Sequence, residues 1–174
     1  GTTIVGRAIR PAQDGTARTV PTGAVARQVV ALDGDALVLI EGDPGAHLEN
    51  HGCLPLAHRR LAGATVLADG PDAAVAYRRA LDEWRTLTAS TLVGITRTAL
   101  DLGVGYVKER HQFGRPIGSF QAIQHLLADL PGLLDGASLL TVNAAWSGGR
   151  SVAGSPGRAY IAAVPFTHPR AHDP

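Results

Sequence analysis

Polar and aromatic side chains crowd one turn in the segment YVKERHQFGRPIGSFQAIQHLLADL, residues 106–130. Apolar-periodic stretches flank this turn, and a plain helical hairpin does not need such side chains at its bend. An arginine offers a planar, permanently charged fork that suits a diphosphate, and glutamine amides can donate hydrogen bonds to phosphate or ribose oxygens. Phenylalanine rings can pack on a ligand or shield it from water. The residues that could do this chemistry are Arg110, His111, Gln112, Phe113, Phe120 and Gln121.

The same residues also have simpler explanations. By its position near a helix end, Arg110 could cap backbone carbonyls or pair with a neighbouring carboxylate such as Glu109. Phe113 and Phe120 could belong to an ordinary core, and the His111 ring could face solvent. Taken alone, the turn leaves both interpretations open.

Composition excludes several classes of protein. The chain has 174 residues, 45% of them apolar and 18% charged, which is enough to bury a core. Its net charge is +1 with no long basic run, so no nucleic acid is expected as a partner. No stretch approaches the roughly 20 apolar residues that span a bilayer. The single Cys53 excludes an internal disulfide and favours the reducing cytoplasm.

One cluster has a superficial likeness to a metal site. His47, His51 and Cys53 lie within seven residues of one another. Zinc sites use three or four ligands at recognisable spacing, usually on hairpins or helices, whereas these residues lie in a strand–loop stretch. We therefore predict no metal ligands.

The first part of the chain is predicted to form strands. Residues 1–20 show little pattern and are expected to be a loop, but aliphatic runs on either side of Asp33-Gly34 predict a hairpin. Further strands are expected near His47–Glu49 and in residues 59–70. Residues 1–70 therefore predict part of an antiparallel β-domain.

The second part is predicted to form two long helices. Gly70-Pro71 ends the strands, Asp72 can cap a helix over about 73–110, and Ser119 can cap a second helix that extends to about 146. Pro131-Gly132 is expected to kink or interrupt the second helix. Glycines in the first helix suggest close packing against neighbours: Gly94, Gly103 and Gly105.

These elements give an α+β fold class, in which part of an antiparallel β-domain precedes two long antiparallel helices of an incomplete bundle. The expected domains are 1–70, 71–147 and an irregular tail at 148–174, which is rich in Gly and Pro. Two helices and a thin sheet do not close a core. Other helices, from the same protein or another subunit, are expected to cover the apolar faces.

The quoted segment resembles the acyl-CoA dehydrogenase family, whose pattern is Y-x-x-x-R-x-Q-F-G followed by P-I-x-x-F-Q-A-x-Q-x-x-L-A-D. The resemblance covers residues 25–147, most densely 80–130, and is expected to end there. It implies an FAD enzyme that dehydrogenates the α,β bond of an acyl-CoA thioester, in dimers or tetramers. In such assemblies the turn that matches Arg110 to Gln121 reaches across a subunit interface to the FAD pyrophosphate and adenosine.

The resemblance also implies substrate-binding residues, at Arg85 and Trp84. An ion pair of Arg85 with Asp82 or Glu83 is the structural alternative. In a minority of members the catalytic glutamate takes the position of Trp84, and Glu83 is rotated about 100° from it on a helix. We therefore predict no catalytic residue in this sequence.

Three hypotheses about function remain open. The sequence contains no methionine, so as written it does not begin at a translation start, and we expect part of a longer dehydrogenase that is inactive alone. The alternatives are a non-catalytic partner subunit that completes an FAD site in a hetero-oligomer, and a degenerate remnant. The tail after Trp146 could stem from a truncated or shifted reading frame. Acyl chain length, and dehydrogenase versus oxidase activity, are not specified by these residues.

Overall fold

The structure is a computed structural model that describes residues 3–148. The chain forms two compact units, with the boundary between Leu81 and Asp82. The first unit contains six strands and the start of a long helix: β1 (Val5–Arg7), β2 (Thr16–Val20), β3 (Gln28–Asp33), β4 (Ala36–Glu41), β5 (Ala57–Arg60), β6 (Thr65–Ala68) and α1 (Pro71–Glu109). The second contains the rest of α1 and the remaining elements: β7 (His111–Gln112), β8 (Arg115–Pro116), the 3-10 turn η1 (Ile117–Ser119) and α2 (Gln121–Gly148).

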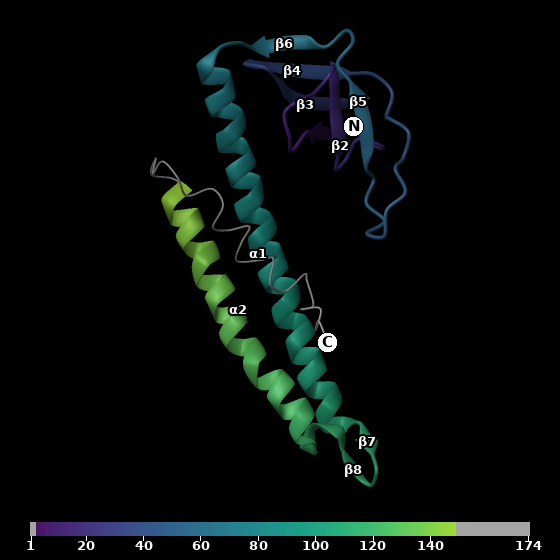
Figure 1. The fold of residues 1–174 in the computed structure, drawn as a ribbon, viewed down its shortest axis with the longest axis vertical. Coiled ribbons are helices and arrows are strands. Elements are labelled where there is room, and N and C mark those ends of the chain that lie inside the picture. Colours follow the sequence, from purple (N-terminus) through teal and green to yellow (C-terminus); the bar gives the residue numbers. More distant parts are fainter. Residues whose placement is uncertain (1–2, 149–174) are drawn as a thin grey trace. The chain divides into compact units, whose positions relative to one another are not determined.

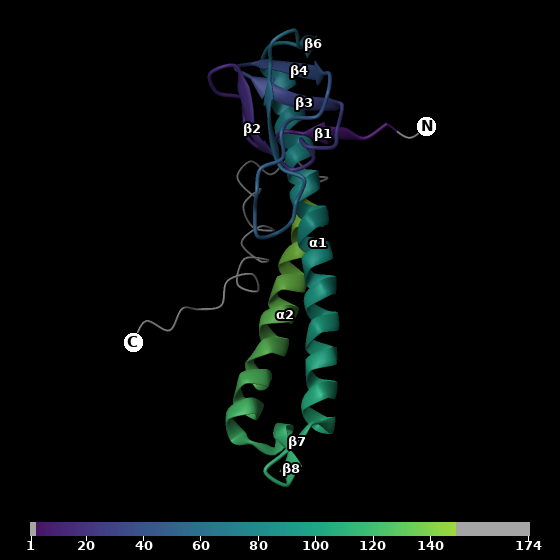
Figure 2. The same ribbon diagram turned by 90° about the vertical axis from the view of Figure 1, so that its right-hand side faces the viewer.

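The strands of the first unit form a four-stranded sheet in the order β1-β3-β4-β6 and a separate β2-β5 pair (Figures 1 and 2). Every pair is antiparallel except β1 and β3, which are parallel. This arrangement confirms the predicted α+β fold with part of a β-domain. The parallel edge pair is a feature that the sequence pattern did not reveal.

Local signals predicted some strands and missed others. The β3–β4 hairpin is confirmed, although its two-residue turn is Gly34-Asp35, one residue later than expected, with Gly34 at φ +57°. The predicted loop over 1–20 was wrong, because β1 and β2 lie there. These strands have three and five residues and pair with distant segments, so they leave little local pattern. The strand expected near His47 is reduced to a single bridge with Ala57.

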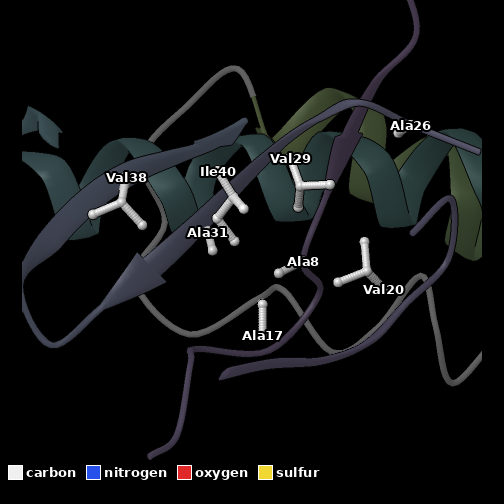
Figure 3. Close-up of a cluster of buried hydrophobic side chains, with 8 residues drawn as sticks. All are labelled: Ala8, Ala17, Val20, Ala26, Val29, Ala31, Val38 and Ile40. Carbon is white, nitrogen blue, oxygen red and sulfur yellow. The ribbon is translucent and has the colours of Figure 1, made fainter. Parts of the chain in front are cut away.

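The core of the first unit is built from small side chains (Figure 3). Four of its eight buried members are alanines, and all eight are at most 5% exposed. Small side chains let the strands and loops approach closely, but each buries less apolar area than Leu or Phe would. The members are Ala8, Ala17, Val20, Ala26, Val29, Ala31, Val38 and Ile40.

A buried arginine ties the loops of this unit together. The Arg59 side chain on β5 is 4% exposed and donates to four backbone carbonyls. Burial lowers the pKa of its guanidinium, and the nearby charge of Asp43 opposes that shift. The carbonyl acceptors belong to Gly23, Ala26, Arg27 and Gly42.

Helix α1 begins two residues before the predicted 73–110 and ends one residue before its expected end. Pro71 is its first residue, a position where proline's fixed φ suits a helix, so Asp72 lies in the first turn rather than at the cap. Tyr77 and Leu81 are 3% and 8% exposed and pack with Leu32. The Tyr77 hydroxyl also donates to the Ala8 carbonyl at 2.6 Å, which fixes the start of α1 to the first unit.

In the second unit, α1 from Asp82 onward and α2 lie side by side and antiparallel, a helical hairpin (Figures 1 and 2). A cavity of about 350 Å³ lies between them, and Ala89 packs with Leu92 and Ala144. Helix α2 continues through Pro131, so the predicted interruption was wrong. Buried side chains beyond the proline help to keep the chain helical: Leu134 and Ala137.

Much of the apolar surface of the helical hairpin remains exposed, as the sequence predicted. Ile95, Leu102 and Leu139 are 60%, 70% and 71% exposed. The close packing expected at the glycines of α1 does not occur within residues 3–148, because a Cβ added at Gly94 or Gly103 would meet no atom within 4 Å. Among residues 3–148, no helix is long and apolar enough to cross a membrane.

Candidate functional site

The turn predicted to bind a ligand forms a small β-hairpin at the end of the two helices, here called the tip hairpin (residues 111–116; Figure 1). His111 pairs with Pro116 and Gln112 with Arg115. The two turn residues, Phe113 and Gly114, have φ of +53° and +77°. Two positive φ angles in a two-residue loop are typical of a type I′ turn. Glycine adopts that conformation without penalty, whereas a phenylalanine there is strained.

Backbone and side-chain hydrogen bonds hold the base of the tip hairpin. The Arg110 amide donates to the Tyr106 carbonyl at 2.9 Å, and the Ile117 amide donates to the Arg110 carbonyl at 2.8 Å. A Cβ on Gly118 would lie 2.9 Å from the Val107 carbonyl oxygen, so η1 lies directly against the end of α1. The position of the Arg110 backbone is therefore set from both sides.

The predicted capping role of Ser119 was wrong. Helix α2 begins at Gln121, two residues later, and the Ser119 hydroxyl donates to the Pro116 carbonyl at 2.7 Å. The Gln124 side chain also donates to the Gly118 carbonyl at 3.0 Å. Both bonds stabilise the 3-10 turn that leads out of the tip hairpin rather than the first turn of α2.

The aromatic side chains of the site contact each other outside any core. Phe113 is 91% exposed, and its ring meets Phe120 edge-to-face with centroids 6.2 Å apart. The Arg115 guanidinium lies over the other ring, with Cζ 4.2 Å from the Phe120 centroid. An aromatic pair of this kind contributes about 0.5–1.5 kcal/mol and an exposed cation–π contact about 0.5–1 kcal/mol. Among the described residues, Phe113 therefore does not belong to a core.

The polar residues of the site all face solvent. Arg110, His111, Gln112 and Gln121 are exposed. A ring nitrogen of His111 lies 2.9 Å from the Glu109 carbonyl oxygen. Within residues 3–148, no carboxylate lies in ion-pair distance of Arg110 or Arg115. The Arg110 guanidinium, which pairs with no carboxylate of the described residues, makes with the exposed amides beside it a donor set that suits a diphosphate.

The two predicted substrate residues lie elsewhere on α1. Arg85 is 25 positions before Arg110, which is about 37 Å along a helix. Its guanidinium pairs with Asp82 at 3.2 Å, the structural alternative weighed from the sequence, and both side chains are about one-third exposed. Trp84 is 38% exposed. The structure thus brings the six predicted cofactor residues together but keeps Arg85 and Trp84 apart from them.

The sequence did not predict Arg115 as a residue of this site. Arg115 was treated only as part of the turn, although a cation five residues before Phe120 across a tight turn can reach the ring.

Among the described residues, no three His, Cys, Asp or Glu side chains group as a metal site would require. Cys53 is exposed.

A family model described as "Acyl-CoA dehydrogenase, C-terminal domain" matches residues 73–170. This match includes all eight predicted site residues. It also extends past residue 147, where the resemblance was expected to end. The tail was predicted at 148–174, and its residues 149–174 lie outside the described residues.

Individual relatives agree with the family match. "Probable acyl-CoA dehydrogenase YngJ" of Bacillus subtilis is 42% identical over 87 residues, which are 50% of this chain and 23% of that protein. "Probable acyl-CoA dehydrogenase FadE25" of Mycobacterium tuberculosis is 32% identical over 125 residues, 72% of this chain and 30% of that protein. The crystal structure of the ChsE4-ChsE5 complex from Mycobacterium tuberculosis superposes with a TM-score of 0.71 and 27% identity, covering 86% of this chain and 48% of that chain.

The chain thus spans less than a third of the curated relatives it matches and about half of the solved structure.

Proposed function

Because this chain belongs to the acyl-CoA dehydrogenase family, we propose that its tip hairpin binds the diphosphate of an FAD whose flavin ring is held elsewhere in the assembled enzyme. The enzyme would dehydrogenate the α,β bond of an acyl-CoA thioester. This proposal rests chiefly on the donor set at the tip hairpin, where Arg110 has no acidic partner among the described residues and lies beside the exposed amides of Gln112 and Gln121. Cations that are not neutralised within the chain are available for an anionic ligand.

Each side chain of the tip hairpin has a distinct part in this proposal. Arg110 supplies the charged fork, and its backbone is fixed by bonds to Tyr106 and Ile117. The exposed amides of Gln112 and Gln121 donate to phosphate or ribose oxygens. Phe113 and Phe120 shield the ligand from water, and His111 borders it. FAD, when bound, supplies the hydride acceptor of the reaction.

We assign no catalytic base to this chain. Trp84 and Arg85 lie far along α1 from the tip hairpin, so we propose that they contact the acyl-CoA substrate in a separate part of the site. The Arg85–Asp82 pair is one-third exposed and spans one helical turn. A pair of this kind is weak in water, so Arg85 is free to exchange Asp82 for an anionic substrate group.

Other subunits complete the site in this proposal. The apolar side chains along the helical hairpin are largely exposed, which supports association with further helices of the same protein or of related chains. A non-catalytic partner subunit is the second candidate. It is favoured by the similarity to one chain of the ChsE4-ChsE5 complex. The exposed, unpaired Cys53 supports a reducing, cytoplasmic setting.

Flavin retention tests the proposal directly. The 174-residue chain is mixed with FAD, freed of unbound ligand by gel filtration and examined for flavin absorption, alone and with a full-length relative as partner. Retention by the chain alone favours an oligomer of this chain, and retention only with the partner favours the partner-subunit role. No retention under either condition would contradict the proposed function.

Arg110→Ala sharpens this test. Loss of one charge-assisted contact should weaken FAD binding by about 1.5–3 kcal/mol, roughly 10- to 150-fold in Kd. Arg97→Ala is the matched control, because it removes an exposed arginine from the same unit without touching the tip hairpin. Equal FAD affinity in the two variants would remove Arg110 from the site.

A further inference from the structure

The tip hairpin holds a conformation that its own backbone does not favour. Phe113 has φ +53°, in the left-handed region where a side chain with a Cβ is strained, and only two residues on each side pair as strands. The bonds to Arg110, Pro116 and Gly118 hold the base of the turn rather than its tip. Some other contact must therefore stabilise the tip itself.

Three side chains supply that contact. Phe120, which precedes α2, contacts both Arg115 and Phe113, with the guanidinium carbon 4.2 Å from its ring centroid and the Phe113 centroid at 6.2 Å. The Phe113 ring is 91% exposed, so burial does not hold it in place. Within residues 3–148, Arg115 pairs with no carboxylate, so the Phe120 ring is what locates its guanidinium.

We propose that Arg115 is a positioning residue that acts through Phe120 to keep the tip hairpin in its strained, ligand-ready turn. A cation over one part of the ring holds Phe120 in the orientation that meets Phe113 edge-to-face. Phe113 then stays in the left-handed conformation, and the Arg110 and Gln112 donors keep their spacing. Arg115 thereby reduces the entropic cost of ordering the turn when a ligand binds. The effect on FAD binding rests on the proposed function. The stabilisation of the turn through the Arg115–Phe120–Phe113 contacts, here called the clamp, does not.

The competing role for Arg115 is direct contact with a phosphate. Both roles predict weaker FAD binding when Arg115 is removed. The two roles differ in the chain without FAD. If Arg115 only binds phosphate, its removal leaves the turn unchanged there, whereas removal of a positioning residue opens the turn more often. They differ again when Phe120 is replaced, since only the positioning role needs the ring.

Opening of the tip hairpin can be measured by chymotrypsin cleavage after Phe113. A protease needs an extended chain, so cleavage in the folded 174-residue protein reports how often the tight turn opens. The rate is divided by that of the synthetic peptide 108–118 carrying the same substitution, which removes the effect of sequence on the protease. Arg115→Ala should raise the normalised rate by about two- to five-fold, the range set by an exposed cation–π contact.

Two further variants separate a cation–π contact from other effects. Arg115→Lys keeps a cation above the ring and should restore most of the protection. Arg97→Ala, the matched control, should cleave at the unmodified rate. Equal rates for Arg115→Ala and the unmodified chain would overturn the proposal, as would a failure of Arg115→Lys to restore protection.

A double-mutant cycle with Phe120→Leu tests the route of the effect. If Arg115 acts through Phe120, adding Arg115→Ala to Phe120→Leu should change the cleavage rate by less than about 1.5-fold. A full additional effect in that background would mean that Arg115 acts through another contact and would refute the positioning role.

Retention of FAD is measured on the same variants to keep the two proposals apart. With the clamp and the cofactor role both correct, Arg115→Ala weakens FAD binding about as much as it speeds cleavage, and Phe120→Leu abolishes the difference. Changed cleavage without any FAD binding by the unmodified chain or its complex would leave the clamp standing and contradict the proposed function. Changed cleavage with unchanged FAD affinity would overturn the link between them.

Discussion

The two units of this chain differ in how far their large apolar side chains are exposed. In the first unit, Val29 and Val20 are fully buried, and a buried arginine and a tyrosine hydroxyl bind the surrounding carbonyls. In the second unit, large apolar side chains such as Leu102 and Leu139 are about 70% exposed. The first unit closes a core of its own, whereas the helical hairpin buries mainly alanines and one leucine between its helices.

This difference separates two kinds of stability. The first unit derives stability from packing and from hydrogen bonds inside the chain, so substitutions there should change unfolding directly. The helical hairpin has surface that only an additional element can cover, so substitutions on its exposed face should matter chiefly for association. The polar tip hairpin lies at one end of this second, incompletely covered unit.

The largest expected effect comes from the buried arginine. Arg59→Met keeps the length of the side chain but removes the donors to the carbonyls of Ala26 and Gly42, among others. We expect a loss of about 2–4 kcal/mol in the free energy of unfolding, because the buried Ala26 carbonyl and the partly buried Gly42 carbonyl lose a charged donor. Urea unfolding of the chain, followed by circular dichroism, measures the change.

The neighbouring arginine provides the control for that prediction. Arg60 has the same side chain on the same strand but is exposed, so Arg60→Met should change the stability by less than about 0.5 kcal/mol. Similar losses for both variants would show that Arg59 does not organise the first unit.

A smaller effect distinguishes the buried core of the first unit from the exposed apolar face of the helical hairpin. Val29→Ala removes two fully buried methyl groups and should destabilise the chain by about 2 kcal/mol. Leu102→Ala removes more apolar volume, yet the side chain is 70% exposed, so the loss should stay below about 0.5 kcal/mol. The free energy of unfolding of both variants, measured at two protein concentrations, checks these values. A large, concentration-dependent loss for Leu102→Ala would place that side chain in an interface between copies of the chain.

The smallest effect is a gain. A Cβ at Gly103 meets no atom within 4 Å, so Gly103→Ala should stabilise α1 by about 0.5–1 kcal/mol through helix propensity alone. The thermal midpoint of the isolated chain should rise accordingly. A fall in that midpoint would mean that a neighbour outside residues 3–148 packs on the glycine, as the sequence first suggested. The comparison of the two units would then need revision.

Sequence reasoning succeeded where the signal was local. Asp33-Gly34 indicated a hairpin because a tight turn needs positive φ, and Gly70-Pro71 marked the boundary between the strands and the first long helix. The segment 106–130 indicated both a helix–turn–helix and a family, and the family match confirmed the latter. Sequence reasoning failed at β1 and β2, because these short strands form only where distant strands pair with them.

The sequence by itself determined the family, the two long helices and the gathering of the site residues at one turn, because each depends on neighbours within a few positions. Only the tertiary structure decided that β1 pairs in parallel with β3, and that Arg59 rather than Arg60 is buried. The tertiary structure also decided that Arg115 lies over Phe120. Strand order, burial and ring contacts depend on which distant segments meet, and a one-dimensional pattern of residue types does not specify those meetings.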